Sequence, residues 1–272
     1  MRQETKVKAL RTSLLKGWAD NMGNLLKLEF AKLKKQKSFY ICTIIMVALL
    51  LLSALTANAL MNASPELAEQ FTASGISSFV SGLNDSSFTL IASIFVVLFI
   101  CEDYASQTVK NIYARGYSRK EVYLSKLISA LISTTVMFVI VEIAAFTVGT
   151  VFFGLGEVGN FKFLALIGTQ YVVAMANIAL TFAVASVIRK NGGAIAGIIL
   201  APMLVGVVTG LADSFLKFED FSLTSLWLSN FLSDVSVLTV SAERIITCLV
   251  GSIIYIPLFV IAGLYFNKKI EL

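Results

Sequence analysis

Few residue combinations in this chain could carry out covalent chemistry. The sequence contains no histidine, which excludes Ser-His-Asp and Cys-His catalysis together with the common zinc sites. It also lacks the Gly-x-x-x-x-Gly-Lys-Ser/Thr pattern of a P-loop, so this polypeptide cannot hold ATP in that way. We therefore expect the chain itself to bind no metal ion and no cofactor, and any ATP must be used by a partner.

A spacing similar to a dinucleotide-binding fingerprint occurs at Gly154, Gly156 and Gly159. The fingerprint works only between a strand and the start of a helix in a βαβ unit, whereas this copy follows a long apolar segment. We interpret it as a glycine-rich turn.

The polar segment 103–126 interrupts a chain that is otherwise made of long apolar runs. Residues 106–115 of this segment can form a short amphipathic helix, for which Gly116 is a natural stop. The apolar side of that helix would carry Val109, Ile112 and Tyr113, with Lys110 and Asn111 beside them.

A short, rigid helix at the apex of a loop is suited to insertion into the groove of a partner. Movement of the partner would then pass to both adjoining apolar segments. Arg119, Lys120 and Lys126 are expected near the membrane surface, where the next apolar segment begins. The alternative interpretation is an ordinary charged loop on the cytosolic side.

Glu142 is an ionisable residue inside the third long apolar segment. It lies about 27 Å along the expected helix, toward its outer half, at about 1.5 Å per residue. A carboxylate at that depth should face protein or a water-filled cavity, because facing lipid would cost several kcal/mol. Two roles remain open: a pathway or gating group, and a structural hydrogen bond to a neighbouring Ser, Thr or Asn.

The fifth apolar segment combines a proline with two pairs of glycines. Pro202 removes one backbone hydrogen bond and bends a helix. Glycines four residues apart let a second helix approach closely, and the two pairs are Gly193 with Gly197 and Gly206 with Gly210. Close helix packing and a bent, mobile pathway helix are the two interpretations.

Membrane-spanning helices are the elements that must position these residues. Hydrophobic residues make up 57% of the 272 residues and charged residues 14%, with a mean hydropathy of +0.83, far from the usage of soluble domains. A run of about 20 apolar residues crosses about 30 Å of hydrocarbon as a helix. Six runs of that length occur, at Phe39–Leu60, Val80–Cys101, Leu124–Phe153, Phe163–Ile188, Gly192–Leu211 and Ile245–Phe266. The predicted fold class is an all-α polytopic membrane protein with six transmembrane helices.

Basic residues indicate the orientation of these spans. If the N-terminus is cytosolic, nineteen of the 22 Lys and Arg residues lie on the inner side and three on the outer side. This asymmetry predicts that both termini are cytosolic. It also explains the net charge of +5 without nucleic-acid binding, for which no basic and aromatic groove pattern is present.

The segments before the first span and between the last two spans have mixed character. We divide the chain into a cytosolic segment, 1–38, and a six-span domain, 39–272, which contains a cytosolic segment at 102–123. Within 1–38, leucines at helical spacing among lysines predict a helix from about Asn24 that lies along the inner membrane surface with its lysines toward the lipid headgroups. Residues 213–243 are too apolar for a solvated loop and too broken for a span, which predicts a short, partly re-entrant helical element on the outer side.

Four stretches of the polar segment carry a resemblance to a known family. They are Asp103-Tyr104, Thr108-Val109-Lys110-Asn111-Ile112, Gly116-Tyr117-Ser118-Arg119 and Tyr123-Leu124-Ser125-Lys126. With the six-span layout, they make the chain resemble the permease subunits of type-2 ABC exporters, particularly bacterial bacteriocin-immunity and drug-efflux permeases. The chain departs from the family pattern at Gln107, where Gly is usual, and at Gly116, where many members have Pro.

The resemblance implies a dimeric exporter in a bacterial cell membrane. Two cytosolic ABC ATPase subunits would bind ATP and Mg²⁺, and a second permease, either a copy or a paralogue, would complete the pathway. The cargo would be hydrophobic or amphipathic, such as an antimicrobial peptide or a drug-like molecule. The residues implied for coupling to the ATPase are Ser106, Thr108, Val109, Lys110, Asn111, Ile112, Tyr113, Arg115, Tyr117, Ser118 and Arg119. The alternatives are a membrane scaffold or sensor without transport, and an ion-coupled secondary carrier.

Overall fold

The computed structural model describes residues 20–63, 76, 78, 86–156, 161–216, 222–236 and 240–269, and within these ranges it contains helices and no β-strand. An N-terminal helix occupies residues 20–33. The helices that follow are α2 (Lys37–Ala63), α5 (Ser86–Ala105), α6 (Thr108–Ala114), α7 (Arg119–Phe153), α8 (Phe161–Ile188), α9 (Asn191–Leu216), the 3-10 helix η1 (Thr224–Leu226), α10 (Leu228–Asp234) and α11 (Ala242–Lys269).

Six of these helices are long and apolar enough to cross a membrane: α2, α5, α7, α8, α9 and α11. The prediction of six membrane-spanning helices is confirmed. The third span begins earlier than its hydropathy predicted, at Arg119 rather than Leu124. A capping box explains the difference: Ser118 Oγ accepts a hydrogen bond from the Glu121 backbone N–H at 3.3 Å, and Glu121 Oε2 accepts one from the Ser118 N–H at 2.8 Å.

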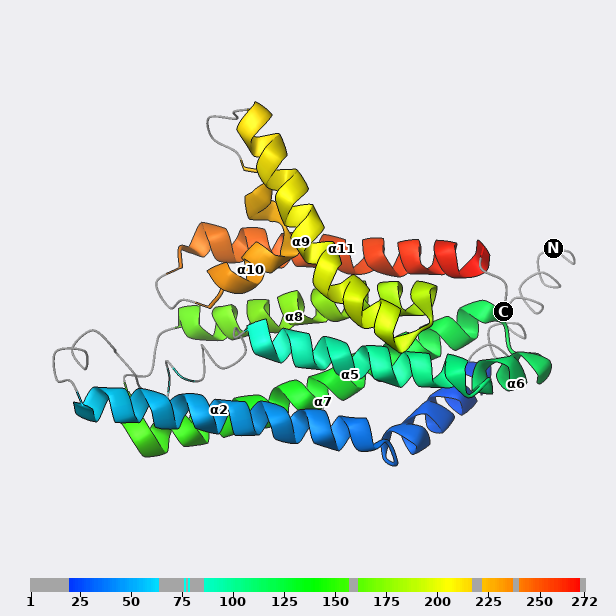
Figure 1. Ribbon diagram of the computed structural model, residues 1–272, viewed down its shortest axis with the longest axis horizontal. Helices are drawn as coiled ribbons and strands as arrows, with labels where there is room; N and C mark the ends of the chain where they lie inside the picture. The colour runs from blue at the N-terminus through cyan, green and yellow to red at the C-terminus, as the bar shows by residue number, and fades with distance from the viewer. Residues whose placement is uncertain are drawn as a thin grey trace, which may run out of the picture.

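Five of the long helices form a bundle, and the sixth leans away from it. In Figure 1, α2, α5, α7, α8 and α11 run along the long axis of the molecule, whereas α9 crosses them at a steep angle. Helices α5 and α8 are the most buried and α9 the least. The core between α5, α7 and α8 is aromatic and tightly packed, because Phe95, Phe99 and Phe182 are almost fully buried.

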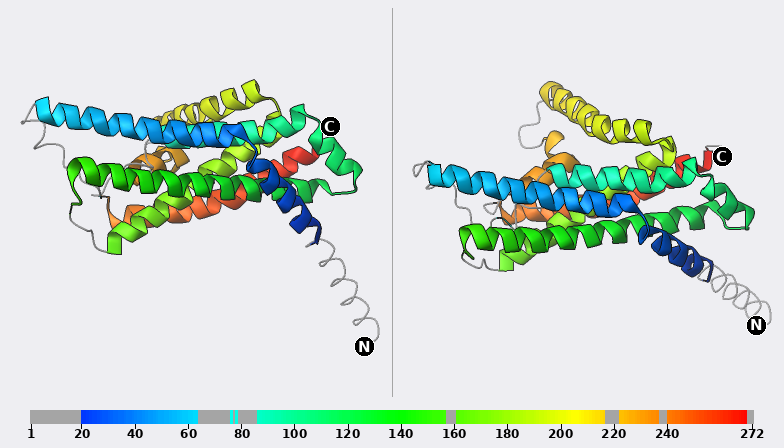
Figure 2. Two further views of the ribbon diagram at one scale, coloured as in Figure 1. Left: turned by 90° about the horizontal axis from the view of Figure 1, so that it is seen from below. Right: turned by 60° about the horizontal axis from the view of Figure 1, so that its bottom comes forward.

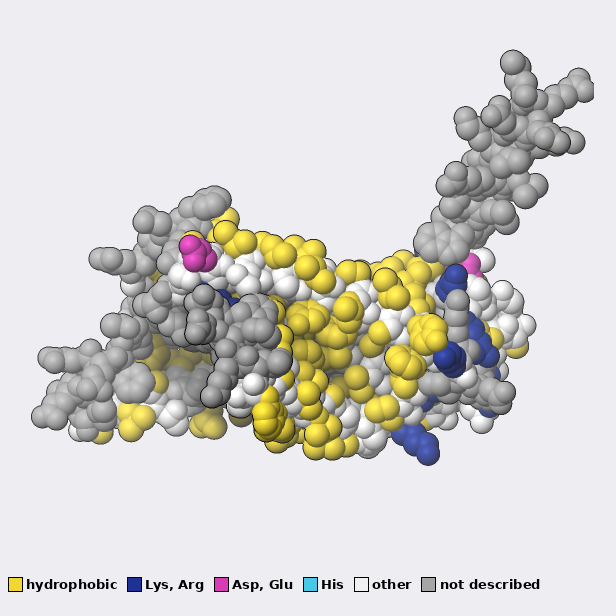
Figure 3. Space-filling view, turned by 90° about the horizontal axis from the view of Figure 1, so that it is seen from above, with side chains coloured by type: hydrophobic (Ala, Val, Ile, Leu, Met, Phe, Trp, Pro, Cys, Tyr) yellow, Lys and Arg dark blue, Asp and Glu magenta, His cyan; other side chains and the backbone are white. Residues whose placement is uncertain are grey.

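The surface of the bundle separates into an apolar middle and a basic end. Hydrophobic side chains cover most of the middle in Figure 3, and Lys and Arg side chains gather at the end where α6 lies. Exposed aliphatic residues of this kind are normal where lipid, rather than water, surrounds a helix. The end of α11 lies at this same end, in agreement with an even number of spans. That this basic end is cytosolic stays a prediction.

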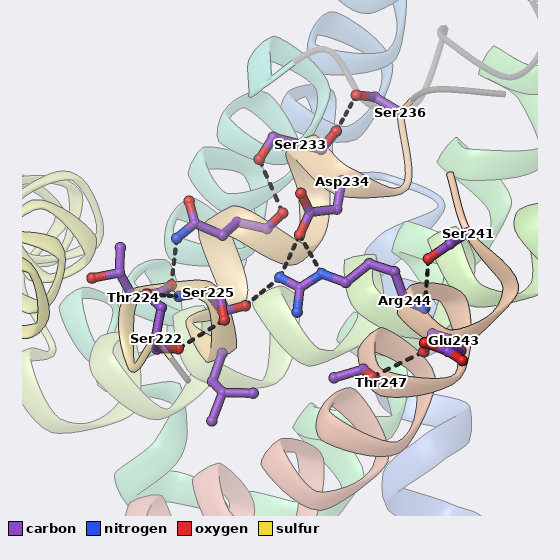
Figure 4. A network of polar contacts seen from close by, with 12 residues as sticks. Ser222, Thr224, Ser225, Ser233, Asp234, Ser236, Ser241, Glu243, Arg244 and Thr247 are labelled. Carbon is purple, nitrogen blue, oxygen red and sulfur yellow. Dashed lines mark hydrogen bonds and ion pairs between the residues drawn. The ribbon is translucent and has the colours of Figure 1, made fainter. Parts of the chain in front are cut away.

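Part of the predicted outer element lies within the described residues and is helical. Leu228 and Phe231 of α10 are buried, in a cluster with residues of α8 and α11. Arg244 at the start of α11 donates to Asp234 and to the Ser225 carbonyl (Figure 4), which ties η1 and α10 to the bundle. Residues 217–221 and 237–239 of this element fall outside the described part, and its depth in the membrane stays a prediction.

Candidate functional site

The basic end of the bundle is assembled from four helices that are distant in sequence. The N-terminal helix, residues 20–33, bends away from α2 (Figure 2) after a turn at residues 34–36. Its Leu25 is buried in an apolar cluster with Val109 and Ile112 of α6 and Val122 of α7. The sequence predicted that this helix lies on the membrane surface. In the structure, the side of the helix that carries Leu25 packs against α6.

Helix α6 is short, and a residue with a positive φ lies just outside each of its two ends. At its start, Gln107 adopts a left-handed conformation with φ +57°, and its carbonyl accepts hydrogen bonds from the N–H groups of Lys110 and Asn111. At its end, Gly116 has φ +88°, and its N–H donates to the Tyr113 carbonyl at 2.9 Å. Gly116 ends the helix as predicted, because a left-handed residue after a helix favours glycine.

The apolar face of α6 points into this chain, and its polar face points out. Val109 and Ile112 are only 1% and 5% exposed, whereas Lys110, Asn111 and Arg115 are exposed. Val109 and Ile112, which the resemblance implied for coupling to the ATPase, are therefore not on the surface in this arrangement, and their part in coupling stays a prediction. These two residues hold α6 in place.

The remaining predicted coupling residues lie along the same end. Ser106, Ser118 and Arg119 are exposed, and Thr108, Tyr113 and Tyr117 are half-buried. Burial raises the pKa of the Tyr113 hydroxyl, so this side chain stays neutral and packs as a ring. The surface that a partner could touch is formed by the exposed members of this set, which we call the α6 surface: Ser106, Lys110, Asn111, Arg115, Ser118 and Arg119.

A cluster of buried charges lies beneath the α6 surface. Lys126 of α7 forms ion pairs with Glu29 of the N-terminal helix, at 2.8 Å, and with Asp103 of α5. Lys32 also pairs with Asp103. The side chains of Lys126, Glu29 and Asp103 are at most 3% exposed. Two cations and two anions balance in this cluster, as a buried group of charges requires.

Sequence reasoning missed this charge cluster. It placed Lys126 at the membrane surface and the lysines of the N-terminal helix toward lipid headgroups, whereas Lys32 turns inward, above the Phe99 ring at 4.8 Å. The partners of Lys126 are 97 and 23 residues away in sequence, so no local spacing reveals them. The available signal was the polar segment itself, which contains acids as well as bases.

Two further contacts join the same elements at the edge of the cluster. Gln36 donates to Glu102 of α5 at 3.1 Å, and Asn21 donates to Glu121 of α7 at 3.4 Å. The N-terminal helix is thus bound to the end of α5 and to the start of α7 at several points. Because α6 connects those two ends, the four elements form one unit, which we call the α6 unit.

Glu142 lies far from this unit along α7. Its side chain is buried, and neither carboxylate oxygen accepts a hydrogen bond from any described residue. The structural hydrogen bond that the sequence left open is therefore not made within the part of the chain described. A pathway or gating role for Glu142 stays a prediction.

The two glycine pairs of α9 lie in different surroundings. A methyl group on Gly193 or Gly197 would approach Ile188 to 3.0 Å, so at these two positions α9 lies close to the end of α8. A methyl group on Gly206 or Gly210 would meet no atom within 4 Å. Gly193 and Gly197 therefore lie where α9 packs closely against α8 of the same chain, and Gly206 and Gly210 face open space. Pro202 lies between them, within α9.

No group of three or more His, Cys, Asp or Glu side chains in the described ranges is arranged to hold a metal ion. The features that are present, six apolar helices and a polar unit at one end, define a multi-pass membrane protein. The chain belongs to the ABC-2 family of transporter proteins, whose sequence profile matches residues 25–210. That range includes the N-terminal helix from Leu25, the α6 unit, the first four spans and most of α9. No curated protein sequence matches the chain.

Family membership gives the general role of the chain. ABC-2 proteins of this kind are membrane permeases, and in such systems ATP hydrolysis takes place on a separate subunit. This agrees with the absence of a P-loop from the sequence.

Proposed function

We propose that this chain is the permease subunit of an ABC exporter, which moves a hydrophobic or amphipathic molecule out of a bacterial cell with ATP hydrolysed by two separate ATPase subunits. The observation that carries the proposal is the two-sided α6: Val109 and Ile112 fix it to its own chain, and Lys110, Asn111 and Arg115 remain exposed for a partner.

The α6 unit is built to transmit force to the spans. Only Ser106 and Gln107 separate α5 from α6, and only residues 115–118 separate α6 from α7. The ion pairs of Lys126 hold the ends of α5 and α7 together across the base of this loop. Displacement of α6 by a closing ATPase dimer would therefore move two spans and the N-terminal helix as one body.

The exposed face of α9 supports a second permease in the assembly. Leu204, Val208 and Phe215 lie on one face of α9 and are 64%, 64% and 83% exposed, whereas Gly206 and Gly210 lie on the other face, next to open space. A helix of a second copy or of a paralogue could approach these small residues closely, with lipid on the remaining apolar surface. Both termini would lie in the cytosol, at the basic end.

Co-expression with the cognate ABC ATPase, recognised by its P-loop, tests the proposal. We expect a detergent-stable complex of two ATPase subunits with two permease subunits, together with ATP hydrolysis that the permease stimulates. A permease that purifies without any ATPase, and that moves its cargo with an ion gradient alone, would favour the secondary-carrier alternative. A complex without transport would favour the scaffold alternative.

Glu142 provides a test of the pathway. A buried carboxyl group that receives no hydrogen bond from the described part of its own chain would find a partner in a cavity, in the cargo or in the second permease. We expect Glu142→Gln to leave assembly with the ATPase intact and to lower cargo transport several-fold. Drug or peptide resistance of cells that carry the variant measures this, with Glu243→Gln at the exposed start of α11 as the control. Unchanged resistance would reject a pathway charge at this position.

A further inference from the structure

Helix α9 leans away from the bundle (Figure 1). A groove of about 340 Å³ lies beside it, lined by residues of α5, α8, α9 and α10. Neither a charged residue nor a histidine lines it. The groove lies between long apolar helices, and its α5 residues come at least ten residues before Asp103 of the α6 unit. None of the functions assigned above uses it.

The polar groups of the groove all lie on one wall. Helix α9 contributes Ile198, Ile199, Ala201, Pro202 and Met203, which form an apolar wall. The facing helices contribute hydroxyl and amide groups, from Thr89, Ser93, Asn177, Thr181, Ser229 and Ser233, together with the aliphatic Leu90, Leu180, Val184 and Leu232. Such a combination suits a molecule with an apolar body and one polar, uncharged end.

Several polar groups in this wall are held in place, and one forms no hydrogen bond with the residues that the structure describes. Thr181 Oγ1 donates to Ser93 Oγ at 2.9 Å, and Asn177 Nδ2 donates to the Val173 carbonyl at 3.1 Å. Thr89 Oγ1 is buried without a hydrogen bond among the described residues. An unpaired buried hydroxyl is unfavourable, and a hydrogen bond from a polar group of a ligand would remove that cost.

Pro202 adds an acceptor on the aliphatic side. A proline has no backbone N–H, so the carbonyl four residues earlier, that of Ile198, receives no helical hydrogen bond from it. Both residues line the groove. Ile199, Gly206 and Gly210 share this face of α9, because they are spaced seven and eleven residues apart along a helix of 3.6 residues per turn.

The charge and size of the groove select among cargo classes. An ionic ligand would lose its hydration without gaining a counter-charge, which costs several kcal/mol. A volume of about 340 Å³ lies at the small end of the range for drug-sized ligands, about 300–1,000 Å³. A whole peptide does not fit this space.

We propose that this groove binds a small, uncharged amphiphile, with its polar end at the α5 and α8 wall and its alkyl part against α9 around Pro202. As a transport site it rests on the proposed exporter function, for which it selects the drug-like cargo class. As a binding site it stands by itself, since no residue of the α6 unit contributes to it.

Photolabelling of the purified protein in lipid nanodiscs tests the groove. The probe is a dodecyl amide with a diazirine on its alkyl chain, and dodecyl trimethylammonium and dodecanoate with the same diazirine are the charged counterparts. We expect the amide to label peptides of α5, α8 and α9 that line the groove, at least about tenfold above the charged probes, and plain dodecyl amide to compete.

Two tryptophan variants fill the groove from opposite sides. Ile199→Trp acts from α9 and Ser229→Trp from α10, and both are expected to reduce the labelling of groove peptides at least about fivefold. The matched control is Val208→Trp, because Val208 is 64% exposed on the opposite face of α9. It should leave groove labelling unchanged.

Equal labelling by all three probes, or labelling that the two groove variants do not reduce, would overturn the proposal and leave the groove a crevice for lipid. These outcomes are independent of ATPase partnership. Specific labelling in a protein that binds no ATPase would support the groove as a binding site and contradict the exporter function. ATP-driven export without specific labelling would support the exporter function and contradict the groove as a binding site.

Discussion

Substitution of Lys126 by Met is expected to destabilise the protein by roughly 3–5 kcal/mol, the usual cost of removing one partner from a buried ion pair. The variant would leave the carboxylates of Glu29 and Asp103 buried with Lys32 as the one remaining cation of the cluster. The methionine fills most of the volume of the lysine, so loss of charge rather than loss of packing dominates the result.

Thermal unfolding of the purified protein in detergent measures this effect. Lys120→Met is the matched control, because Lys120 lies in the same helix, is exposed, and has no ion pair among those found in the described residues. The double variant Lys126→Met, Glu29→Gln restores the charge balance and should recover part of the lost stability. Equal unfolding temperatures for Lys126→Met and Lys120→Met would show that the cluster does not hold the α6 unit together.

Loss of the cluster should also weaken coupling. Without Lys126, the base of the loop between α5 and α7 loses two of its ion pairs, and motion of α6 would be absorbed locally. A protein that remains folded at low temperature is therefore expected to bind the ATPase and to transport poorly.

The spans were predictable because each is a self-contained apolar run whose burial in lipid depends little on the other helices. The end of α6 at Gly116 was predictable for a similar local reason, a glycine that accepts φ +88°. Hydropathy alone placed the start of α7 five residues late, although Ser118 and Glu121 have the spacing of a capping box.

Long-range arrangements could not be derived in this way. An amphipathic helix such as α6 has an apolar face that can bury either in its own chain or in a partner, and the pattern of Val109 and Ile112 is the same in both cases. The pairing of Lys126 with Glu29 depends on how the N-terminal helix folds back, and no local signal encodes that. For the same reason, the different surroundings of Gly197 and Gly206 followed only from the tilt of α9.

Disruption of α6 is expected to have the second large effect, on stimulation of the ATPase. Proline at position 113 lies inside the seven-residue α6 and costs a helix about 3 kcal/mol, or about two orders of magnitude in helix population. We expect Tyr113→Pro to leave membrane insertion intact and to abolish stimulation of the ATPase. Tyr113→Phe is the control, since it keeps the ring and the helix.

Charge reversal tests the same surface without breaking the helix. Lys110 and Arg115 are exposed, so Lys110→Glu with Arg115→Glu should not disturb the packing of Val109 and Ile112. If these cations face a carboxylate-bearing groove of the ATPase, repulsion should weaken the complex by at least about tenfold, which corresponds to about 1.4 kcal/mol. Arg119→Glu tests the same surface from the start of α7, because Arg119 is exposed.

ATP hydrolysis by the reconstituted complex of this permease with its ATPase is the most direct test that energy enters through α6. The account predicts stimulated hydrolysis with the unmodified permease and with Tyr113→Phe, and basal hydrolysis with Tyr113→Pro and with the Lys110→Glu, Arg115→Glu variant, all four proteins being inserted equally. Full stimulation by both of the disrupted variants would contradict it.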